Sequence, residues 1–440
     1  MKYETMKTVI LVFLVGVSIY LTWTLWTFQV NYEEINNSEP VKEVVEPKEV
    51  KEIVQPNKLV FHENDHYVGT TNETEINRVM DEIAAWKFYD IGEAKAYRSN
   101  DINKVLNGPN KLIIEFPDLV PFELYKGVLR VSDREIPNEE FDILVIDLSN
   151  PSQKVATAYF INTKGNANKV FSGSASYSSL QAFVNKIKNK NESYVPYDSY
   201  KVTNGRFLLL PKDSVKLNRN RYYWDKLDGD IIERYKNALF PDPKVVEKSL
   251  DGNNVGYNDG TSFLNAKTDL GTISFINPGE ITGNYHNGKD LIKRSIDFVN
   301  QNGGWNDDFR YFSKNQEKNQ VIFRLFMNGI PVFNNNHLAE IVQSWGESQI
   351  YEYERPYIDE MGSLLMTDYQ EVQLPSASSV LESLLKDDKI DHKKIENILV
   401  GYQLDYDSIN KILLFEPTWY YQYDGKWQPW DIKGEKYGLE

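Results

Sequence analysis

The sequence predicts an α+β protein in which a single N-terminal transmembrane helix is followed by an extracellular array of mixed helix and antiparallel-sheet domains. Three observations support this fold class. An uncharged apolar stretch covers residues 8–30, a Pro- and Glu-rich segment covers residues 31–57, and helix and strand patterns fill residues 58–440. Because the strand patterns occur in groups and do not alternate strictly with helices, the α+β class is favoured over a parallel α/β sheet.

The apolar stretch Thr8–Val30 is typical of a membrane anchor. It carries no charge, and thirteen of its twenty-three residues are Val, Ile, Leu or Phe. At about 1.5 Å per residue it reaches about 34 Å, which is enough to cross a hydrocarbon core of about 30 Å. Lys2 and Lys7 precede the stretch and two glutamates follow it. The positive-inside bias therefore places residues 1–7 in the cytoplasm.

A cleaved signal peptide is the competing interpretation of the same stretch. Such a peptide has an apolar core of about 7 to 15 residues and small residues at the cleavage site. This stretch instead ends in Trp26, Thr27, Phe28 and Gln29. We therefore expect a single-pass protein of the cell membrane, with its N-terminus cytoplasmic and its C-terminal bulk extracellular.

Composition argues against several classes of function. The formal net charge of −15 disfavours a nucleic-acid groove, so no nucleic acid is expected as a partner. The chain has no cysteine, which excludes disulfides, thiolate catalysis, Cys-ligated zinc and iron–sulfur clusters. Hydrophobic residues make up 41% of the chain, which is enough for packed cores in two or three outer domains.

Residues 31–57 are predicted to form a solvated stalk. Three prolines prevent one continuous helix: Pro40, Pro47 and Pro56. Apolar residues nevertheless recur at helical spacing, for example at Val50, Ile53 and Val54. A passive tether is the simpler interpretation, and a stalk that pairs with the stalk of a partner is the alternative.

Residues 58–200 are predicted to form the first extracellular α+β domain. Thr71 or Asn72 can cap a helix with apolar residues on one face, and Ser176 or Ser178 can begin a second helix. The strand patterns between these helices lie at Lys111–Phe116, Phe141–Leu148 and Val155–Asn162.

Two further α+β domains are predicted at residues 201–278 and 279–440. Their helices are expected at Asp230–Leu239, at Asp290–Asn300 and after Ser376 or Ser378. Strand patterns occur at residues 206–211, 220–224, 321–327, 331–333, 349–353, 398–404 and 411–419. Turns are expected at Asn258-Asp259-Gly260 and Asp424-Gly425, and Gly303-Gly304 is expected to stop the helix at Asp290–Asn300.

Residues 62–66 match the H-E-x-x-H zinc motif. The motif requires a helix, because only that spacing puts His62 and His66 on one face with Glu63 as base. Residues 58–61 instead form an apolar run of strand type, and Asn64-Asp65 is typical of a turn. A zinc hydrolase is therefore a minor alternative, and a loop at the edge of a domain is expected here.

Other catalytic patterns are weaker still. Ser383 and Lys386 fit S-x-x-K, but the motifs that accompany it in β-lactamases are missing. The remaining histidines are scattered among polar residues: His286, His337 and His392. We therefore predict no enzyme activity, no catalytic or metal-binding residue and no cofactor.

An aromatic cluster near the C-terminus suggests a binding alternative. Its members are Trp419, Tyr420, Tyr421, Tyr423, Trp427 and Trp430. Exposed aromatic rings can stack on sugars, so an anchored protein that binds cell-envelope polysaccharide is the second class considered. In a hairpin, however, alternate residues point into the core, so about half of these rings are expected to be packing residues.

The layout of the chain resembles a known family. The start MKYETMK, the anchor LVGVSIYLTWTLWTFQ, the Pro- and Glu-rich stalk and an outer array without catalytic residues resemble YycH. These proteins are membrane-anchored regulators of the cell-wall sensor kinase WalK, also called YycG, in Gram-positive bacteria. The resemblance covers the whole chain by layout and is most specific over residues 1–30.

The resemblance implies a mechanism and partners. It implies three extracellular domains, of which the last two resemble the soluble part of the companion protein YycI. It also implies that the anchor helices of both regulators associate with the membrane helices of the kinase and set its activity. Whether this effect is restraint or activation stays open, as does any extracellular signal.

One face of the anchor helix carries polar residues. A helical wheel places Leu11, Leu14, Val15, Ser18, Thr22, Leu25 and Gln29 on one stripe. Polar side chains in lipid favour a partner helix, so Ser18, Thr22, Leu25 and Gln29 are the predicted partner-binding face. The rival stripe consists of Gly16, Tyr20, Trp23 and Thr27. A lipid-facing Ser or Thr that bonds its own i−4 carbonyl is the remaining alternative.

Overall fold

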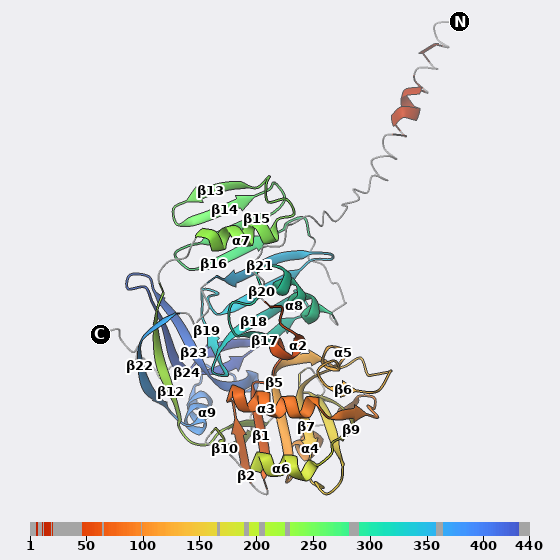
Figure 1. The fold of residues 1–440 in the computed structure, drawn as a ribbon, viewed down its shortest axis with the longest axis vertical. Helices are drawn as coiled ribbons and strands as arrows, with labels where there is room; N and C mark the ends of the chain where they lie inside the picture. The colour runs from red at the N-terminus through yellow and green to blue at the C-terminus, as the bar shows by residue number, and fades with distance from the viewer. Residues whose placement is uncertain are drawn as a thin grey trace. The chain divides into compact units, whose positions relative to one another are not determined.

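The computed structural model describes two units of the chain, residues 1–41 and 42–440 (Figure 1). The described residues are 6–7, 11, 13–18, 20, 46–63, 66–97, 99–164, 168–188, 193–201, 207–224, 229–280, 290–357 and 364–430. In the first unit the described residues, including Ser18, are helical and exposed. Thr22, Leu25 and Gln29 lie outside the described residues. Within the described part, no helix is long and apolar enough to cross a membrane.

The first sheet of the second unit consists of eleven described strands in the order β11-β10-β2-β1-β5-β7-β8-β9-β3-β6, with β4 paired to β9. Its strands are β1 (Lys58–Glu63), β2 (His66–Thr70), β3 (Lys87–Tyr89), β4 (Lys95–Tyr97), β5 (Lys111–Pro121), β6 (Arg130–Val131), β7 (Glu140–Asp147), β8 (Val155–Asn162), β9 (Asn168–Ser176), β10 (Val195–Lys201) and β11 (Phe207–Pro211).

Helices cover both faces of this sheet. Alternate residues of a strand point to opposite faces, so Leu59 and Phe61 of β1 join the core under α3 (Glu73–Ala84) and α6 (Leu180–Lys188). Val60 joins a separate core with α4 (Ser99–Leu106) on the other face. A short helix, α5 (Phe122–Tyr125), follows β5.

The second sheet consists of fourteen described strands in the order β13-β14-β15-β16-β21-β20-β18-β19-β23-β24-β12-β22, with β17 paired to β18 and β25 paired to β24. Its strands are β12 (Val215–Tyr223), β13 (Glu247–Asp251), β14 (Asn254–Asn258), β15 (Phe263–Lys267), β16 (Thr272–Ile276), β17 (Phe309–Asn315), β18 (Gln320–Met327), β19 (Ile330–Phe333), β20 (Glu340–Trp345), β21 (Ile350–Pro356), β22 (Leu365–Leu374), β23 (Ile395–Asp407), β24 (Ile412–Tyr423) and β25 (Lys426–Pro429).

Three helices pack against the second sheet. α7 (Gly229–Leu239) and α8 (Leu291–Gln301) belong to the large core that continues into the first sheet. α9 (Ala377–Lys386) packs on a smaller core that includes Trp419 of β24 and Leu208 of β11. A 3₁₀ turn, η2 (His392–Lys394), precedes β23.

The helix signals in the sequence were largely correct. Asn72 caps α3, because its Oδ1 accepts the Glu75 N–H at 3.1 Å, and Ser376 caps α9. The cap of α6 differs from the prediction. Ser179, not Ser176 or Ser178, accepts the Ala182 N–H at 3.2 Å, since Ser176 is still the last residue of β9.

Strand pairing crosses the predicted domain boundaries at residues 200 and 278. β11, in the predicted second domain, extends the first sheet by pairing with β10. β16, in the same predicted domain, pairs with β21 of the predicted third domain. We therefore describe two sheets, and the division of the outer part into three domains stays a prediction.

Candidate functional site at the seam between the two sheets

Residues 46–57, here called the docked segment, pack into the folded unit. They were predicted to be the end of a solvated stalk, and this is wrong for the described part of that stalk. The side chain of Ile53 is 0% exposed and that of Val54 is 1% exposed. Residues 31–45, the rest of the predicted stalk, lie outside the described residues. The helical spacing of Val50, Ile53 and Val54 thus marks a buried face and not a solvated coil.

The docked segment contains one helical turn, α2 (Val50–Ile53). The Glu52 carboxylate accepts the Glu49 N–H at 2.7 Å, which satisfies a donor at the helix start. Figure 1 shows α2 beside β17 and near α5. At its far end the Asn57 N–H donates to the Glu115 carbonyl of β5 at 3.0 Å. The segment therefore leads directly into the first sheet through β1.

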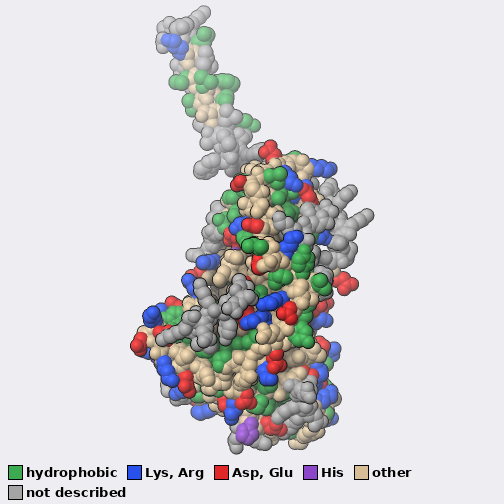
Figure 2. Space-filling view, turned by 90° about the vertical axis from the view of Figure 1, so that its left-hand side faces the viewer, with side chains coloured by type: hydrophobic (Ala, Val, Ile, Leu, Met, Phe, Trp, Pro, Cys, Tyr) green, Lys and Arg blue, Asp and Glu red, His purple; other side chains and the backbone are tan. Residues whose placement is uncertain are grey.

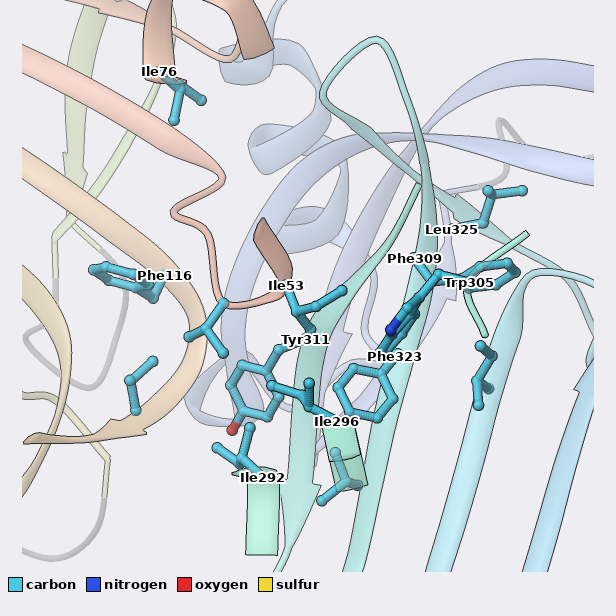
Figure 3. Close-up of a cluster of buried hydrophobic side chains, with 14 of the residues drawn as sticks. Ile53, Ile76, Phe116, Ile292, Ile296, Trp305, Phe309, Tyr311, Phe323 and Leu325 are labelled. Atoms are coloured by element: carbon cyan, nitrogen blue, oxygen red, sulfur yellow. The ribbon is translucent and has the colours of Figure 1, made fainter. Parts of the chain in front are cut away.

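The apolar residues around Ile53 come from both sheets. Figure 3 places Ile53 between Phe116 of β5 and Phe323 of β18, next to Tyr311 of β17. Ile292 and Ile296 of α8 complete the cluster: all five belong with Ile53 to one buried core. Burying an Ile or Val side chain contributes about 1.5–3 kcal/mol. Ile53 and Val54 therefore act as apolar anchors of the docked segment.

Polar contacts beside this cluster join β5 to β17, and we call this junction the seam. The pairing of β5 with β7 is irregular between Glu115 and Val120, which frees Asp118 and Leu119 to face β17. The Tyr311 hydroxyl donates to the Leu119 carbonyl at 2.7 Å. One Asp118 oxygen accepts the Lys314 N–H at 2.9 Å. The seam is therefore held by directional bonds as well as by packing.

A buried arginine forms a second link between the sheets. Arg310 of β17 is 2% exposed, and its guanidinium donates to both oxygens of Asp308 at 2.8 and 2.6 Å. The same group pairs with Glu73 at 2.6 Å. Glu73 is the first residue of α3, where the helix dipole already favours a carboxylate. The arginine charge is thus neutralised from both sides of the seam.

Two side-chain oxygens of the docked segment are buried without a hydrogen-bond partner among the described residues. They are Gln55 Oε1 and Asn57 Oδ1. Leaving such an acceptor unsatisfied costs about 1–3 kcal/mol. This cost is similar in size to the gain from burying Ile53 and Val54. The docking free energy is therefore a small difference, which the remaining contacts of the segment decide.

Those remaining contacts involve Lys48 and α8. The backbone of Lys48 pairs with the side chain of Asn300, and the Nζ of Lys48 donates to the Asp307 carbonyl at 3.1 Å.

The docked segment also forms one wall of a groove of about 1170 Å³, which α3, residues 123–130 and α8 complete. Figure 2 shows acidic and basic side chains interspersed over one face of the molecule. The groove likewise carries charges of both signs, including Lys51 and Asp81.

Comparison with known proteins identifies the family. The family model "YycH protein, N-terminal domain" matches residues 4–193, and "YycH protein, C-terminal domain" matches residues 205–435. The chain belongs to the YycH family. The resemblance seen in the sequence is thereby confirmed. The match covers the docked segment and both sides of the seam.

Two relatives from Bacillus subtilis resemble this YycH-family chain over most of its length. One, named "Two-component system WalR/WalK regulatory protein YycH", is 24% identical over 98% of this chain and 96% of the relative. The other is the crystal structure of YycH from Bacillus subtilis, with a TM-score of 0.73, 21% identity, and coverage of 88% of this chain and 98% of that chain. The structural match shows that the two share a fold.

The H-E-x-x-H string of this YycH-family chain lies on a β-hairpin. Glu63 of β1 pairs with His66 of β2, and His62 pairs with Tyr67. Neighbouring residues of a strand face opposite sides, so the two histidines do not share a face. His62 is 8% exposed, accepts the Gly108 N–H at 3.0 Å and stacks on Tyr67. The predicted loop is thus a strand pair inside the sheet.

The aromatic cluster of the YycH C-terminal region does not form an open platform. Trp419 is 0% exposed, and its indole N–H donates to the Pro375 carbonyl at 3.0 Å. Tyr420 is buried and stacks on Phe333, and Trp427 packs on the same phenylalanine. Trp430 donates to Ser383 at 2.6 Å. Trp419 and Tyr420 are therefore core residues, the other four rings are partly buried against the same cores, and Ser383 is the hydrogen-bond partner of Trp430.

The remaining histidines do not belong to a metal-binding cluster in the described part of the chain. His337 lies 3.9 Å from Glu354 and 4.0 Å from Glu340 on an exposed turn. No group of three or more His, Asp or Glu residues in the described part of the chain could hold a metal ion. His286 lies outside the described residues. Sequence reasoning missed the seam, although the spacing of Val50, Ile53 and Val54 was the signal that could have found it.

Proposed function

We propose that this chain is a membrane-anchored, non-enzymatic regulator of a WalR/WalK-type two-component system that controls cell-wall metabolism. The observation that carries this proposal is the match of both YycH family models, which together cover most of the chain. The printed name of the Bacillus subtilis relative supports the choice of system. The partners are a WalK (YycG) sensor kinase, a companion YycI protein and the cell membrane.

The regulator acts through contacts of its transmembrane helix with the kinase and the companion protein. Residues 8–30 are long and apolar enough to be that helix. Ser18, Thr22, Leu25 and Gln29 form the contact face. Each interhelical hydrogen bond in lipid contributes about 0.6 to 2 kcal/mol. Two or three such bonds that form in only one signalling state of the kinase would shift its equilibrium by about eightfold or more.

The docked segment supports this mechanism by the way it connects the chain. A flexible tether would let the folded unit and the membrane helix move independently. Here residues 46–57 are packed into the folded unit, so the predicted stalk that separates this unit from the predicted membrane helix shortens from residues 31–57 to residues 31–45. A shorter connection limits independent movement more than a stalk of residues 31–57 would.

A matched pair of threonine variants tests the proposal. Thr22 lies on the predicted contact stripe and Thr27 on the opposite stripe, so Thr22→Leu and Thr27→Leu make the same chemical change on different faces. A photo-reactive residue at position 18 reports the contact with the kinase in membranes, and a WalR-dependent reporter reads its effect. We expect Thr22→Leu to lower cross-linking at least threefold and to change reporter output, while Thr27→Leu leaves both unchanged.

Two results would contradict the proposal. One is cross-linking to the kinase that neither variant affects. The other is a larger effect of Thr27→Leu than of Thr22→Leu, which would assign the contact to the rival stripe. Insertion and amount of each variant are checked by immunoblotting of isolated membranes, so that loss of protein is not mistaken for loss of contact.

A further inference from the structure

We propose that the docked segment is a releasable strap for the seam. When residues 46–57 are docked, they hold β5 and β17 together; when they are pulled out, the two sheets can separate along these strands. This conformational device is built from contacts within the folded unit. The strap does not depend on the proposed regulatory function. It adds a route by which displacement of the N-terminal region would loosen the contact between the two sheets.

The segment is placed to act as a strap because it touches both sides of the seam. At one end the Lys48 backbone is bound by Asn300 of α8, which packs on the second sheet. At the other end the Asn57 N–H donates to Glu115 of β5 in the first sheet. Between them Ile53 lies in the core shared by the two sheets (Figure 3). Removing the segment therefore removes a bridge and not only a surface layer.

The segment is also placed to be released from its N-terminal end. Residues 46 and 47 are exposed, and Lys48 is the first of the described residues of this unit that forms hydrogen bonds to the rest of it. α2 is a single turn, which has no stability of its own. The side-chain oxygens of Gln55 and Asn57, which have no hydrogen-bond partner among the described residues, oppose docking. A pull on the preceding chain thus acts first on the Lys48–Asn300 pair and then on Ile53.

Release would weaken the seam next to the strap. Ile53 fills the space beside Tyr311 and Ile296, and packed interiors tolerate such voids poorly. The Tyr311 hydroxyl bond to Leu119 and the Lys314 N–H bond to Asp118 would then border a cavity open to water. These two bonds are the ones expected to open first.

Hydrogen exchange of the full chain in nanodiscs tests the strap. Ile53→Asp places a charge in the shared core and should undock the segment, whereas Lys51→Asp changes an exposed residue of the same helical turn. We expect Ile53→Asp to speed exchange about tenfold in residues 113–121 and 309–315. Exchange in the β8–β9 and β23–β24 pairs should change less than about twofold. Lys51→Asp should match the parent chain throughout.

A cysteine lock provides the converse test. The chain has no cysteine, so Lys48→Cys with Asn300→Cys can be joined selectively by a short bis-maleimide. The joined form should slow exchange in residues 46–57, 113–121 and 309–315 compared with the unjoined form. If Ile53→Asp unfolds the whole unit, the comparison of the joined with the unjoined cysteine variant tests the strap by itself. Faster exchange confined to residues 46–57 in Ile53→Asp, or a lock that leaves the seam peptides unchanged, would overturn the proposal.

Discussion

Asn300 binds the backbone of Lys48 through both halves of its side-chain amide. Its Oδ1 accepts the Lys48 N–H at 3.0 Å, and its Nδ2 donates to the Lys48 carbonyl at 3.0 Å. The same Oδ1 accepts the Trp305 indole N–H at 2.7 Å, which fixes the orientation of the amide. One side chain near the end of α8 thus serves as a strand-like partner for the docked segment.

Asn300→Ala is expected to destabilise the folded unit by about 1.5–4.5 kcal/mol. The change removes three hydrogen bonds, each of which contributes about 0.5–1.5 kcal/mol. It also leaves the Trp305 indole N–H without its acceptor. The measurement is the urea dependence of tryptophan fluorescence in the purified chain. Gln301→Ala, at the exposed next position of α8, is the control and should stay within about 0.5 kcal/mol of the parent. Equal losses in both variants would refute a special role for Asn300.

Local signals in the sequence predicted much of the secondary structure. Capping by Asn72 and by Ser376, and the strand Val155–Asn162, follow from patterns confined to a few neighbouring residues. The turn Asp424-Gly425 was predicted for the same reason, and both residues do adopt positive φ, at 51° and 75°. Such features depend on backbone preferences that act locally, so no knowledge of the tertiary structure is needed.

Features that depend on distant residues could not be predicted in this way. The spacing of Val50, Ile53 and Val54 predicts one apolar face. The sequence around them does not indicate that α8 and β17, more than 200 residues later, supply the surface on which this face packs. β12 pairs with β22 and β24, which lie far along the chain, and β19 pairs in parallel with β23. The seam is made of such non-local contacts. Whether Thr22, Leu25 and Gln29 form a contact face stays a prediction.

Removal of divalent metal is expected to leave the stability of the chain unchanged. His62 and His66 face opposite sides of the β1–β2 hairpin, so they cannot form a helix-type zinc site. A ligand that binds only the folded state raises its stability, and losing it lowers the melting temperature. Calorimetry before and after dialysis against EDTA should therefore agree within about 1 °C. A fall that equimolar zinc reverses would restore the zinc-hydrolase alternative.

Tyr311→Phe is expected to destabilise the seam by about 1 kcal/mol. The change removes only the hydroxyl that donates to Leu119 at 2.7 Å and keeps the buried ring. A neutral hydrogen bond contributes about 0.5–1.5 kcal/mol. Tyr369→Phe is the matched control, because Tyr369 is 66% exposed on β22. Urea unfolding of both variants provides the comparison, and an effect of Tyr369→Phe as large as that of Tyr311→Phe would contradict the assignment.

Glu233 is expected to make the stability of the α7 region depend on acid pH. Hydrogen bonds from Lys236 and Tyr257 lower the pKa of its carboxyl to about 2, and the Tyr257 hydroxyl lies 2.6 Å from its Oε1. An unfolded glutamate has a pKa of about 4.3. The unfolded state therefore binds a proton before the folded state does, so the contribution of Glu233 is present above about pH 4.3 and is lost as pH falls toward 2.

Comparison of the parent chain with Glu233→Gln across this window tests the pH dependence. The side chain is 39% exposed, so solvent screening limits its contribution at pH 6 to about 1 kcal/mol. The difference in unfolding free energy between parent and variant should shrink toward zero near pH 2.5, measured by urea titration at each pH. Glu247→Gln on the exposed strand β13 corrects for the general loss of one carboxylate. A difference that stays constant from pH 6 to 2.5 would show that the hydrogen bonds to Glu233 do not stabilise its charged form.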